Sequence, residues 1–342
     1  MPAGFVYLSG EHPVIPVEEL RGSLEAEGVK YRELLRLDQL VLLEVDDTSG
    51  LARAVTRSAY SREGGYLLAV ADYGDIGALS DGIRRLGDVG VRRVQVRVER
   101  VKGSIEPADA VELQGQLIRA AVSSGLLVDQ LSDNLVKAYV SEGAVVLGLV
   151  RAKRSLGDVR SRSPPNKPFW RSGELDTLLS RALVNMSRLR SGGTFLDPFC
   201  GTGTIAVEAY LVGASRSLCL DVDPSMVSGA LANARWLGYD IFVAQENSLA
   251  MPLRPASVES IATDPPYGRS TRAPGGYENV VRGFLREARR VLRADGHLVF
   301  AGPADEVPYR LAAEEGFLVR ARIDQFVHSA MTRQIVVAKK TA

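Results

Sequence analysis

The pattern of apolar and polar positions changes character near residue 150. Before it, segments with alternating apolar residues, typical of strands, are interspersed with segments in which apolar residues recur every three or four positions, typical of helices. Residues 91–101 (VRRVQVRVERV) read as a strand, and residues 108–125 as a long helix. The pattern predicts small α+β sheets with helices on one face, in two units divided near residue 50.

From residue 172 onward, strands and helices alternate regularly, which is typical of a doubly wound α/β fold. The last two strands are joined by a short polar loop and predict an antiparallel hairpin that closes an otherwise parallel sheet. The sequence therefore predicts an α/β, Rossmann-like domain with a mostly parallel seven-stranded sheet. Its strands are expected at 193–197, 217–222, 240–244, 260–264, 297–302, 319–327 and 334–340.

Residues 151–171 are rich in basic residues and proline and have no periodicity, so they read as a linker or an extended arm. The expected organisation is an N-terminal unit over 1–50, a second unit over 51–152, a basic linker over 153–171 and an α/β domain over 172–342.

Composition narrows the class of protein. The 342 residues are 46% hydrophobic and 24% charged, with a formal net charge of +1, so a polyanionic partner has to meet a local basic patch. Two cysteines and three histidines are too few for a zinc site or a disulfide framework, and no apolar run approaches the roughly 18 to 20 residues that span a bilayer. We expect a monomeric cytoplasmic protein without bound metal or membrane attachment.

The strand ending at Asp197 runs into a glycine-rich loop. Gly201, Gly203 and Ala206 fit the G-x-G-x-x-G/A spacing, and Asp221 follows Gly201 by twenty residues. This spacing alone is the dinucleotide fingerprint, but a carboxylate at Asp197 would repel a pyrophosphate at the helix N-terminus. The acid argues against NAD and for a cationic ligand.

S-adenosylmethionine is such a ligand, since it has no phosphate and carries an ammonium and a sulfonium that Asp197 can attract. The glycines let the backbone approach the methionyl part, and Asp221 is placed to accept both ribose hydroxyls. Asn247 and Ser248 are candidates for the adenine amine, although an asparagine in a loop commonly serves the turn itself. Cys200 reads as a small packing residue rather than a nucleophile.

The sequence TDPPYG at 263–268 follows a strand that should neighbour the one carrying Asp197. At that edge, the Asp264 carboxylate and the Pro265 carbonyl can accept hydrogen bonds from an amine, proline holds the carbonyl still, and Tyr267 offers a face for a base to stack on. These parts suit methyl transfer to an exocyclic amine. The alternative is a proline-stiffened turn with a helix-capping acid.

Four stretches, LDPFCGTGTI, DPPYG, KPFWRSGELDTLLSRALVNMSRL and HSAMTRQIVV, resemble the archaeal tRNA guanine-N2 methyltransferases, which act on the guanine at the tenth tRNA position. RRVQVRVERVKG and AYVSEGAVVLGLVRA are similar to a THUMP domain, which a ferredoxin-like unit precedes. The chain departs from that family at Arg171-Ser172-Gly173, where His-Pro-Gly is common. The resemblance implies S-adenosylmethionine as cofactor and tRNA as partner. THUMP modules are associated with binding the acceptor end of tRNA.

The candidate residues fall into three groups. The cofactor group is Asp197, Phe199, Gly201, Thr202, Gly203, Thr204, Asp221, Asn247 and Ser248. The group that holds the target amine is Asp264, Pro265, Pro266 and Tyr267. The RNA-contacting group is Arg92, Arg93, Arg97, Arg151, Lys153, Arg154, Arg162, Lys167 and Phe169.

Two alternatives stay open. An adenine-N6 or cytosine-N4 methyltransferase acting on DNA or ribosomal RNA would use the same Asp-Pro-Pro-Tyr turn. A tRNA-binding module without catalysis would keep only the fold. For the strand arginines, the solvated face of an edge strand is as good an interpretation as RNA contact.

Overall fold

A computed structural model describes residues 1–88, 90–266, 276–329 and 331–341. Compactness divides the chain into two units. The first comprises residues 1–11, 27–56 and 60–155, and the second comprises residues 12–26, 57–59 and 156–342. The predicted boundaries at residues 50, 152 and 171 stay predictions.

The first unit is built on one eight-stranded sheet in the order β2-β3-β1-β4-β8-β7-β5-β6. The long strands β4 and β8 pair antiparallel at its centre, so one continuous sheet includes strands from both of the predicted N-terminal units. Its elements are β1 (Ala3–Leu8), β2 (Tyr31–Leu37), β3 (Leu40–Val45), α2 (Thr48–Arg57), β4 (Ser61–Asp72), α3 (Ile76–Asp88), β5 (Arg93–Arg100), η1 (Val101–Gly103), α4 (Pro107–Ser123), β6 (Leu127–Val128), β7 (Leu135–Ser141) and β8 (Ala144–Lys153).

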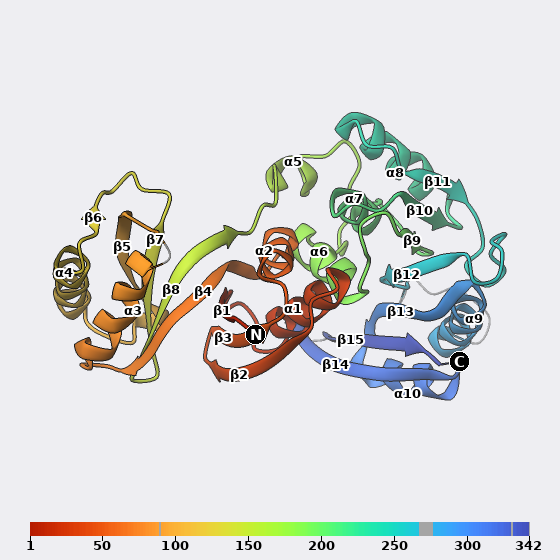
Figure 1. Cartoon of the computed structure of the whole chain (residues 1–342). Helices are drawn as coiled ribbons and strands as arrows, with labels where there is room; N and C mark the ends of the chain where they lie inside the picture. Colours follow the sequence, from red (N-terminus) through yellow and green to blue (C-terminus); the bar gives the residue numbers. More distant parts are fainter. Residues whose placement is uncertain (89, 267–275, 330, 342) are drawn as a thin grey trace. The chain divides into compact units, whose positions relative to one another are not determined.

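The second unit contains the predicted seven-stranded sheet, in the order β11-β10-β9-β12-β13-β15-β14 (Figure 1). All pairings are parallel except those of β15 with β13 and β14, which confirms the predicted closing hairpin. Its elements are α1 (Ile15–Ala26), α5 (Val159–Arg162), α6 (Thr177–Met186), β9 (Thr194–Asp197), α7 (Thr204–Leu211), β10 (Arg216–Asp221), α8 (Pro224–Leu237), β11 (Phe242–Gln245), β12 (Val258–Thr263), α9 (Gly276–Val291), β13 (Leu292–Pro303), η3 (Ala304–Glu306), α10 (Pro308–Glu314), β14 (Phe317–His328) and β15 (Met331–Lys340).

Helices cover both faces of this sheet, which explains the near-continuous apolar runs of its strands. Successive residues of β10 point to opposite faces: Cys219 joins a core with α7 and α8, and Leu220 joins a core with α9. On the second face, Phe284 packs edge-on against Phe199 and Phe300, with ring centroids 5.3 and 6.2 Å apart. The helices packed on the two faces therefore hold the carboxyl ends of the strands in fixed positions.

Local signals in the sequence explain where the helices begin. Asp223 caps α8 by accepting a 2.7 Å hydrogen bond from the Ser225 amide, and Pro224 occupies the first turn. Asp176 caps α6 in the same way, with the Leu179 amide at 2.9 Å. Each acid satisfies one amide that the first helical turn leaves without an intrahelical partner.

Helix α1 belongs to the second unit although it lies near the start of the chain. Glu19 accepts hydrogen bonds from the Ala59 amide at 2.6 Å and from Asn185 Nδ2 at 2.7 Å, and all of these groups are buried. A Cβ on Gly22 would lie 2.4 Å from the carbonyl oxygen of Asn185, so only glycine allows α1 to approach α6 this closely. The helix is therefore an integral part of this unit.

Candidate active site

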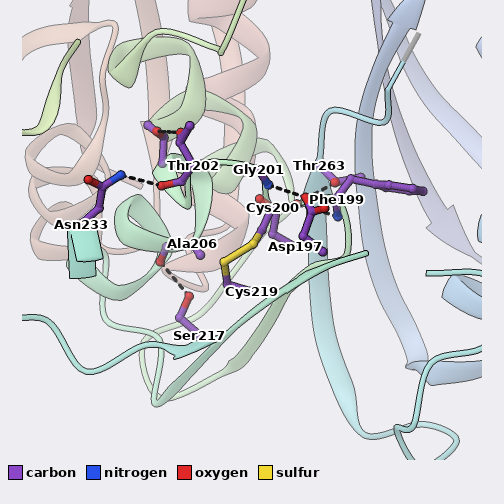
Figure 2. The surroundings of a disulfide bond; sticks show 12 residues. Asp197, Phe199, Cys200, Gly201, Thr202, Ala206, Ser217, Cys219, Asn233 and Thr263 are labelled. Carbon is purple, nitrogen blue, oxygen red and sulfur yellow. Dashed lines mark hydrogen bonds between the residues drawn. A yellow bond between two sulfur atoms is a disulfide. The ribbon is translucent and has the colours of Figure 1, made fainter. Parts of the chain in front are cut away.

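Asp197 ends β9 and is fully buried. Its Oδ1 accepts hydrogen bonds from Thr263 Oγ1 at 2.6 Å and from the Phe199 amide at 3.3 Å (Figure 2). Its Oδ2 is buried and has no hydrogen-bond partner. Burial, with a smaller contribution from the negative charges of Asp221 and Asp264, raises the pKa of Asp197 to about 8. The site thus contains a buried carboxylate oxygen that a cationic ligand can satisfy.

The glycine-rich loop adopts the backbone that its sequence requires. Gly201 and Gly203 have φ values of +50° and +85°, a region that favours glycine. The Gly201 amide donates a 2.8 Å hydrogen bond to Asp221 Oδ2, which ties the loop to the end of β10. Burial raises the pKa of Asp221. The acid predicted to hold ribose hydroxyls therefore also shapes the loop.

Cys200, which belongs to this loop, forms a disulfide with Cys219 of β10 (Figure 2). Both residues are buried, and the Cys200 amide also donates to the carbonyl of Leu220 at 2.9 Å. The expectation that Cys200 is only a small packing residue was wrong, because the loop turns back against β10 and brings the two sulfurs together.

Asp264 follows β12 at the same edge of the sheet as Asp197. Strands β12 and β9 are parallel neighbours, as the sequence predicted, and Ser260 lies opposite Phe195 and Ile261 opposite Leu196. Asp264 is half-buried, Pro265 is buried and Pro266 is exposed. Tyr267 lies outside the described residues. The strand order reverses between β9 and β12, which is where open α/β sheets bind their ligands.

Asn247 and Ser248 follow β11 at this edge. Asn247 Oδ1 accepts a 2.9 Å hydrogen bond from the Leu249 amide, a turn of the kind that asparagine commonly forms. Ser248 is buried. Their contact with an adenine amine stays a prediction.

Two of the predicted RNA contacts, Arg162 and Lys167, are buried inside the second unit. Arg162 donates to Glu208 Oε1 at 2.7 Å, and Lys167 Nζ lies 2.7 Å from Thr204 Oγ1. Phe169 is half-buried, and its ring packs on Gly229, where a Cβ would lie 2.1 Å from the ring. Lys167 and Phe169 thus belong to the surroundings of the cofactor loop. The predicted linker contains a short helix, α5, and Arg162 and Lys167 are its buried residues, while many of its other residues are exposed.

The other predicted RNA contacts have accessible side chains in the first unit. Arg92 and Arg97 are exposed, and Arg93 is exposed with an ion pair to Asp129 at 3.0 Å. Arg151 is exposed and lies 5.8 Å from the centre of the Tyr66 ring. Lys153 is exposed and Arg154 is half-buried.

Sequence reasoning missed Thr263 and Asn233. Thr263 is fully buried and holds the Asp197 carboxylate, and Asn233 on α8 hydrogen-bonds to the carbonyl of Thr202 at 2.9 Å. Thr263 directly precedes the Asp-Pro-Pro turn, so the pairing of β12 with β9 could have indicated it. Asn233 lies inside a helix, and no sequence signal marks it.

A groove of about 760 Å³ lies at the opposite edge of the sheet, where β9, β10 and β11 begin. Thr194, Arg216 and Phe242 are among its lining residues. None of the predicted cofactor or amine-holding residues lines it, so it is separate from the site around Asp197.

The described residues contain no group of three or more His, Cys, Asp or Glu side chains arranged to hold a metal ion. None of their helices combines the length and the apolar character that crossing a bilayer requires.

The fold and the site together define a Rossmann-like, S-adenosylmethionine-dependent methyltransferase. Residues 164–335 match the family model described as UPF0020, RMKL-like, methyltransferase domain, and the chain belongs to this family.

Several relatives are similar over long stretches. A tRNA (guanine(10)-N2)-dimethyltransferase of Methanothermobacter thermautotrophicus is 28% identical over 98% of both chains, and its namesake in Pyrococcus abyssi is 29% identical over 90% of this chain and 98% of its own. A probable tRNA (guanine(10)-N2)-dimethyltransferase of Methanothermococcus thermolithotrophicus is 35% identical over 48% of this chain and 98% of its own. The crystal structure of TrmN from Thermus thermophilus, at 20% identity, covers 99% of both chains with a TM-score of 0.51, which shows a shared fold.

Proposed function

We propose that this protein transfers methyl groups from S-adenosylmethionine to the N2 amine of the guanine at the tenth position of tRNA. The observation that carries the methyl-donor part is the buried Asp197 Oδ2, which has no hydrogen-bond partner and lies beside the strand that leads to Asp264. Similarity to guanine(10)-N2 dimethyltransferases over 98% of the chain supports the base, the position and the addition of two methyl groups.

The residues present suit the donor. When bound, S-adenosylmethionine supplies a methyl group that its sulfonium makes electrophilic. Asp197 offers a carboxylate to the ammonium of the methionyl part, and Asp221 offers one to the ribose hydroxyls. Gly201 and Gly203 carry no side chain, so the loop backbone can approach the ligand closely at these two positions. A cation also relieves the repulsion between Asp197 and the neighbouring acids Asp221 and Asp264.

Asp264 and Pro265 act on the acceptor. An exocyclic amine is a weak nucleophile because its lone pair is delocalised into the ring. The Asp264 carboxylate and the Pro265 carbonyl orient the two N–H groups, so that the lone pair faces the methyl carbon. As the nitrogen–carbon bond forms, Asp264 accepts the proton that the nitrogen releases. Proline at 265 and 266 restricts the backbone φ angles and keeps the carbonyl in place.

Binding of tRNA requires contacts beyond the reacting base. Turning a paired base out of a helix costs a few kcal/mol, and remote contacts offset it. We assign these contacts to the first unit, whose basic side chains are accessible at Arg92, Arg93, Arg97, Arg151 and Lys153. The guanidinium of Arg151 lies over the Tyr66 ring. An arginine beside an aromatic ring can bind a phosphate and also stack against a base.

Nucleoside analysis tests the proposal. Unmodified tRNA transcript is incubated with the protein and isotopically labelled S-adenosylmethionine, digested, and separated by mass spectrometry. We expect N2-methylguanosine followed by N2,N2-dimethylguanosine, and a transcript with adenosine at position 10 should stay unlabelled. Label in adenosine or cytidine would assign the protein to the alternative base-amine methyltransferases, and binding of tRNA without any label would favour the non-catalytic module.

A further inference from the structure

A buried lysine connects the segment before β9 to the cofactor loop. Lys167 Nζ lies 3.0 Å from Thr202 Oγ1, 2.7 Å from Thr204 Oγ1 and 2.9 Å from Glu174 Oε1. Both threonines are themselves buried. Thr202 belongs to the glycine-rich loop, and Thr204 begins α7. The ammonium therefore reaches the loop from a segment 35 residues earlier in the chain.

The chemistry of the ammonium fixes how these hydroxyls point. An ammonium only donates hydrogen bonds, so each threonine oxygen accepts one from Lys167 and keeps its own proton for another acceptor. The two hydroxyl oxygens are 3.2 Å apart, so one hydroxyl can donate to the other. At least one proton still remains for a group outside the cluster. The cluster is thus a hydrogen-bond donor beside a buried positive charge.

This donor cluster sits at the amino-terminal end of α7, where the helix amides also favour an anion. Glu174 offsets the charge of Lys167, while Asp197 supplies the negative charge on the strand that leads into the same loop. An α-amino acid carries an ammonium and a carboxylate on one carbon atom. Asp197 suits the ammonium of such a ligand, and the donor cluster suits its carboxylate. The two groups flank one glycine-rich loop.

A second buried side chain holds the segment in register. Asn233 Nδ2 donates to the carbonyl oxygens of Phe169 at 2.8 Å and Thr202 at 2.9 Å, and its Oδ1 accepts from the Phe169 amide at 2.9 Å. The close approach of the Phe169 ring to Gly229 allows no side chain there. These contacts fix the segment, and with it Lys167, against the loop.

We propose that Lys167 is a positioning residue of the methyl-donor site, which orients the Thr202 and Thr204 hydroxyls to donate to the carboxylate of the methionyl moiety, and that Asn233 holds the segment that carries it. This inference rests on the proposed function. It assigns Lys167 to cofactor recognition and removes it from the RNA contacts.

Comparing the binding of two ligands distinguishes this positioning role of Lys167 from a purely structural role. S-adenosylmethionine and its decarboxylated form share the ammonium, the sulfonium and the adenosine, and differ in the carboxylate. Calorimetric titration of the full chain with each ligand should show that Lys167→Met weakens S-adenosylmethionine binding about tenfold or more, the loss of a charge-assisted hydrogen bond. Binding of the decarboxylated ligand should change less than about twofold.

Matched variants complete the test. Lys30→Met removes an exposed lysine of the first unit and should change neither affinity. Asn233→Leu should weaken both ligands alike, because it releases the loop as a whole. If Lys167→Met does not fold, Thr204→Val keeps the lysine and should show the same selective loss.

Equal loss of both ligands in Lys167→Met, or no loss of either, would overturn the positioning role. Failure of the unmodified protein to bind S-adenosylmethionine would instead overturn the proposed function.

Discussion

The hydroxyl of Thr263 donates a 2.6 Å hydrogen bond to Asp197 Oδ1, so the last residue of β12 holds the carboxylate at the end of β9. This bond links the strand end assigned to the methyl donor with the strand end that leads to the acceptor site. It also opposes the rise in the pKa of Asp197 that burial causes.

Replacing Thr263 with valine, which has nearly the same shape, removes this hydrogen bond and should raise the pKa of Asp197 beyond about 8. Because the protonated acid cannot pair with an ammonium, the valine variant should bind S-adenosylmethionine more weakly than the wild type below pH 8. The deficit should shrink as the pH rises above 8. Calorimetric titration from pH 6.5 to 9.5 measures it, and Thr263→Ser should restore the wild-type profile. A deficit that is the same at every pH would show that the bond matters only for packing.

Asp197→Asn should cost cofactor binding but stabilise the protein without cofactor at high pH. The folded pKa of about 8 lies above the ordinary value of 3.8, so the protonated acid favours folding at low pH and this contribution is lost as the pH rises through 8. The melting temperature of the variant relative to wild type should therefore be higher at pH 9 than at pH 5. Thermal unfolding at both pH values without ligand measures the difference, and a constant difference would contradict the raised pKa.

Asp264→Ala should lower turnover by at least about 100-fold, the range expected when a group that orients an amine and accepts its proton is removed. Cofactor affinity should stay within about threefold of wild type, since Asp264 is assigned to the acceptor amine and acts on the cofactor site only through its charge. Single-turnover methylation of tRNA and titration with S-adenosylmethionine measure the two quantities. A variant that keeps most of its rate would exclude the role assigned to this carboxylate.

The buried ion pairs of Glu208 should matter far more for stability than an exposed pair. Glu208 is fully buried and binds Arg162 at 2.7 Å and Arg181 at 2.6 Å. Arg162→Met should lower the free energy of unfolding by about 2 kcal/mol or more, because it leaves part of a buried charge unpaired. Arg84→Met breaks the exposed pair with Asp81 and should cost less than about 0.5 kcal/mol. Urea unfolding compares the two, and equal effects would contradict this difference.

Replacing Arg92, Arg93 and Arg97 together with glutamine should weaken tRNA binding without affecting cofactor binding. If each contacts a phosphate, the slope of the logarithm of affinity against the logarithm of salt concentration should fall by about 2 to 3. Filter binding at several salt concentrations measures this slope. An unchanged slope would identify these arginines as a solvated face of β5.

The carboxyl ends of the strands were predictable because parallel strands that share a sheet emerge at one edge. Asp197 and Asp264 could be placed there from the apolar runs that precede them. The burial of Lys167 and Arg162 was not predictable, since their partners Thr204 and Glu208 lie about 40 residues away and charge alone suggested an exposed arm.

The disulfide was within reach of the sequence. Cys219 lies in β10 and Cys200 follows the neighbouring strand β9 by three residues, so parallel pairing brings them close once the loop is known to fold back. The location of α1 was beyond such reasoning. An apolar helix face can pack against the core of either unit. The buried contacts of Glu19 and Gly22 with Asn185 place α1 in the second unit.

The membership of α1 in the second unit has a consequence for synthesis on the ribosome. Residues 15–26 emerge early, but their partners on α6 follow about 160 residues later. The catalytic half cannot mature from its own contiguous stretch of polypeptide, and a gene fragment beginning at Leu156 encodes it without one of its helices. Assembly of this unit therefore needs residues from near the start of the chain as well as residues from its second half.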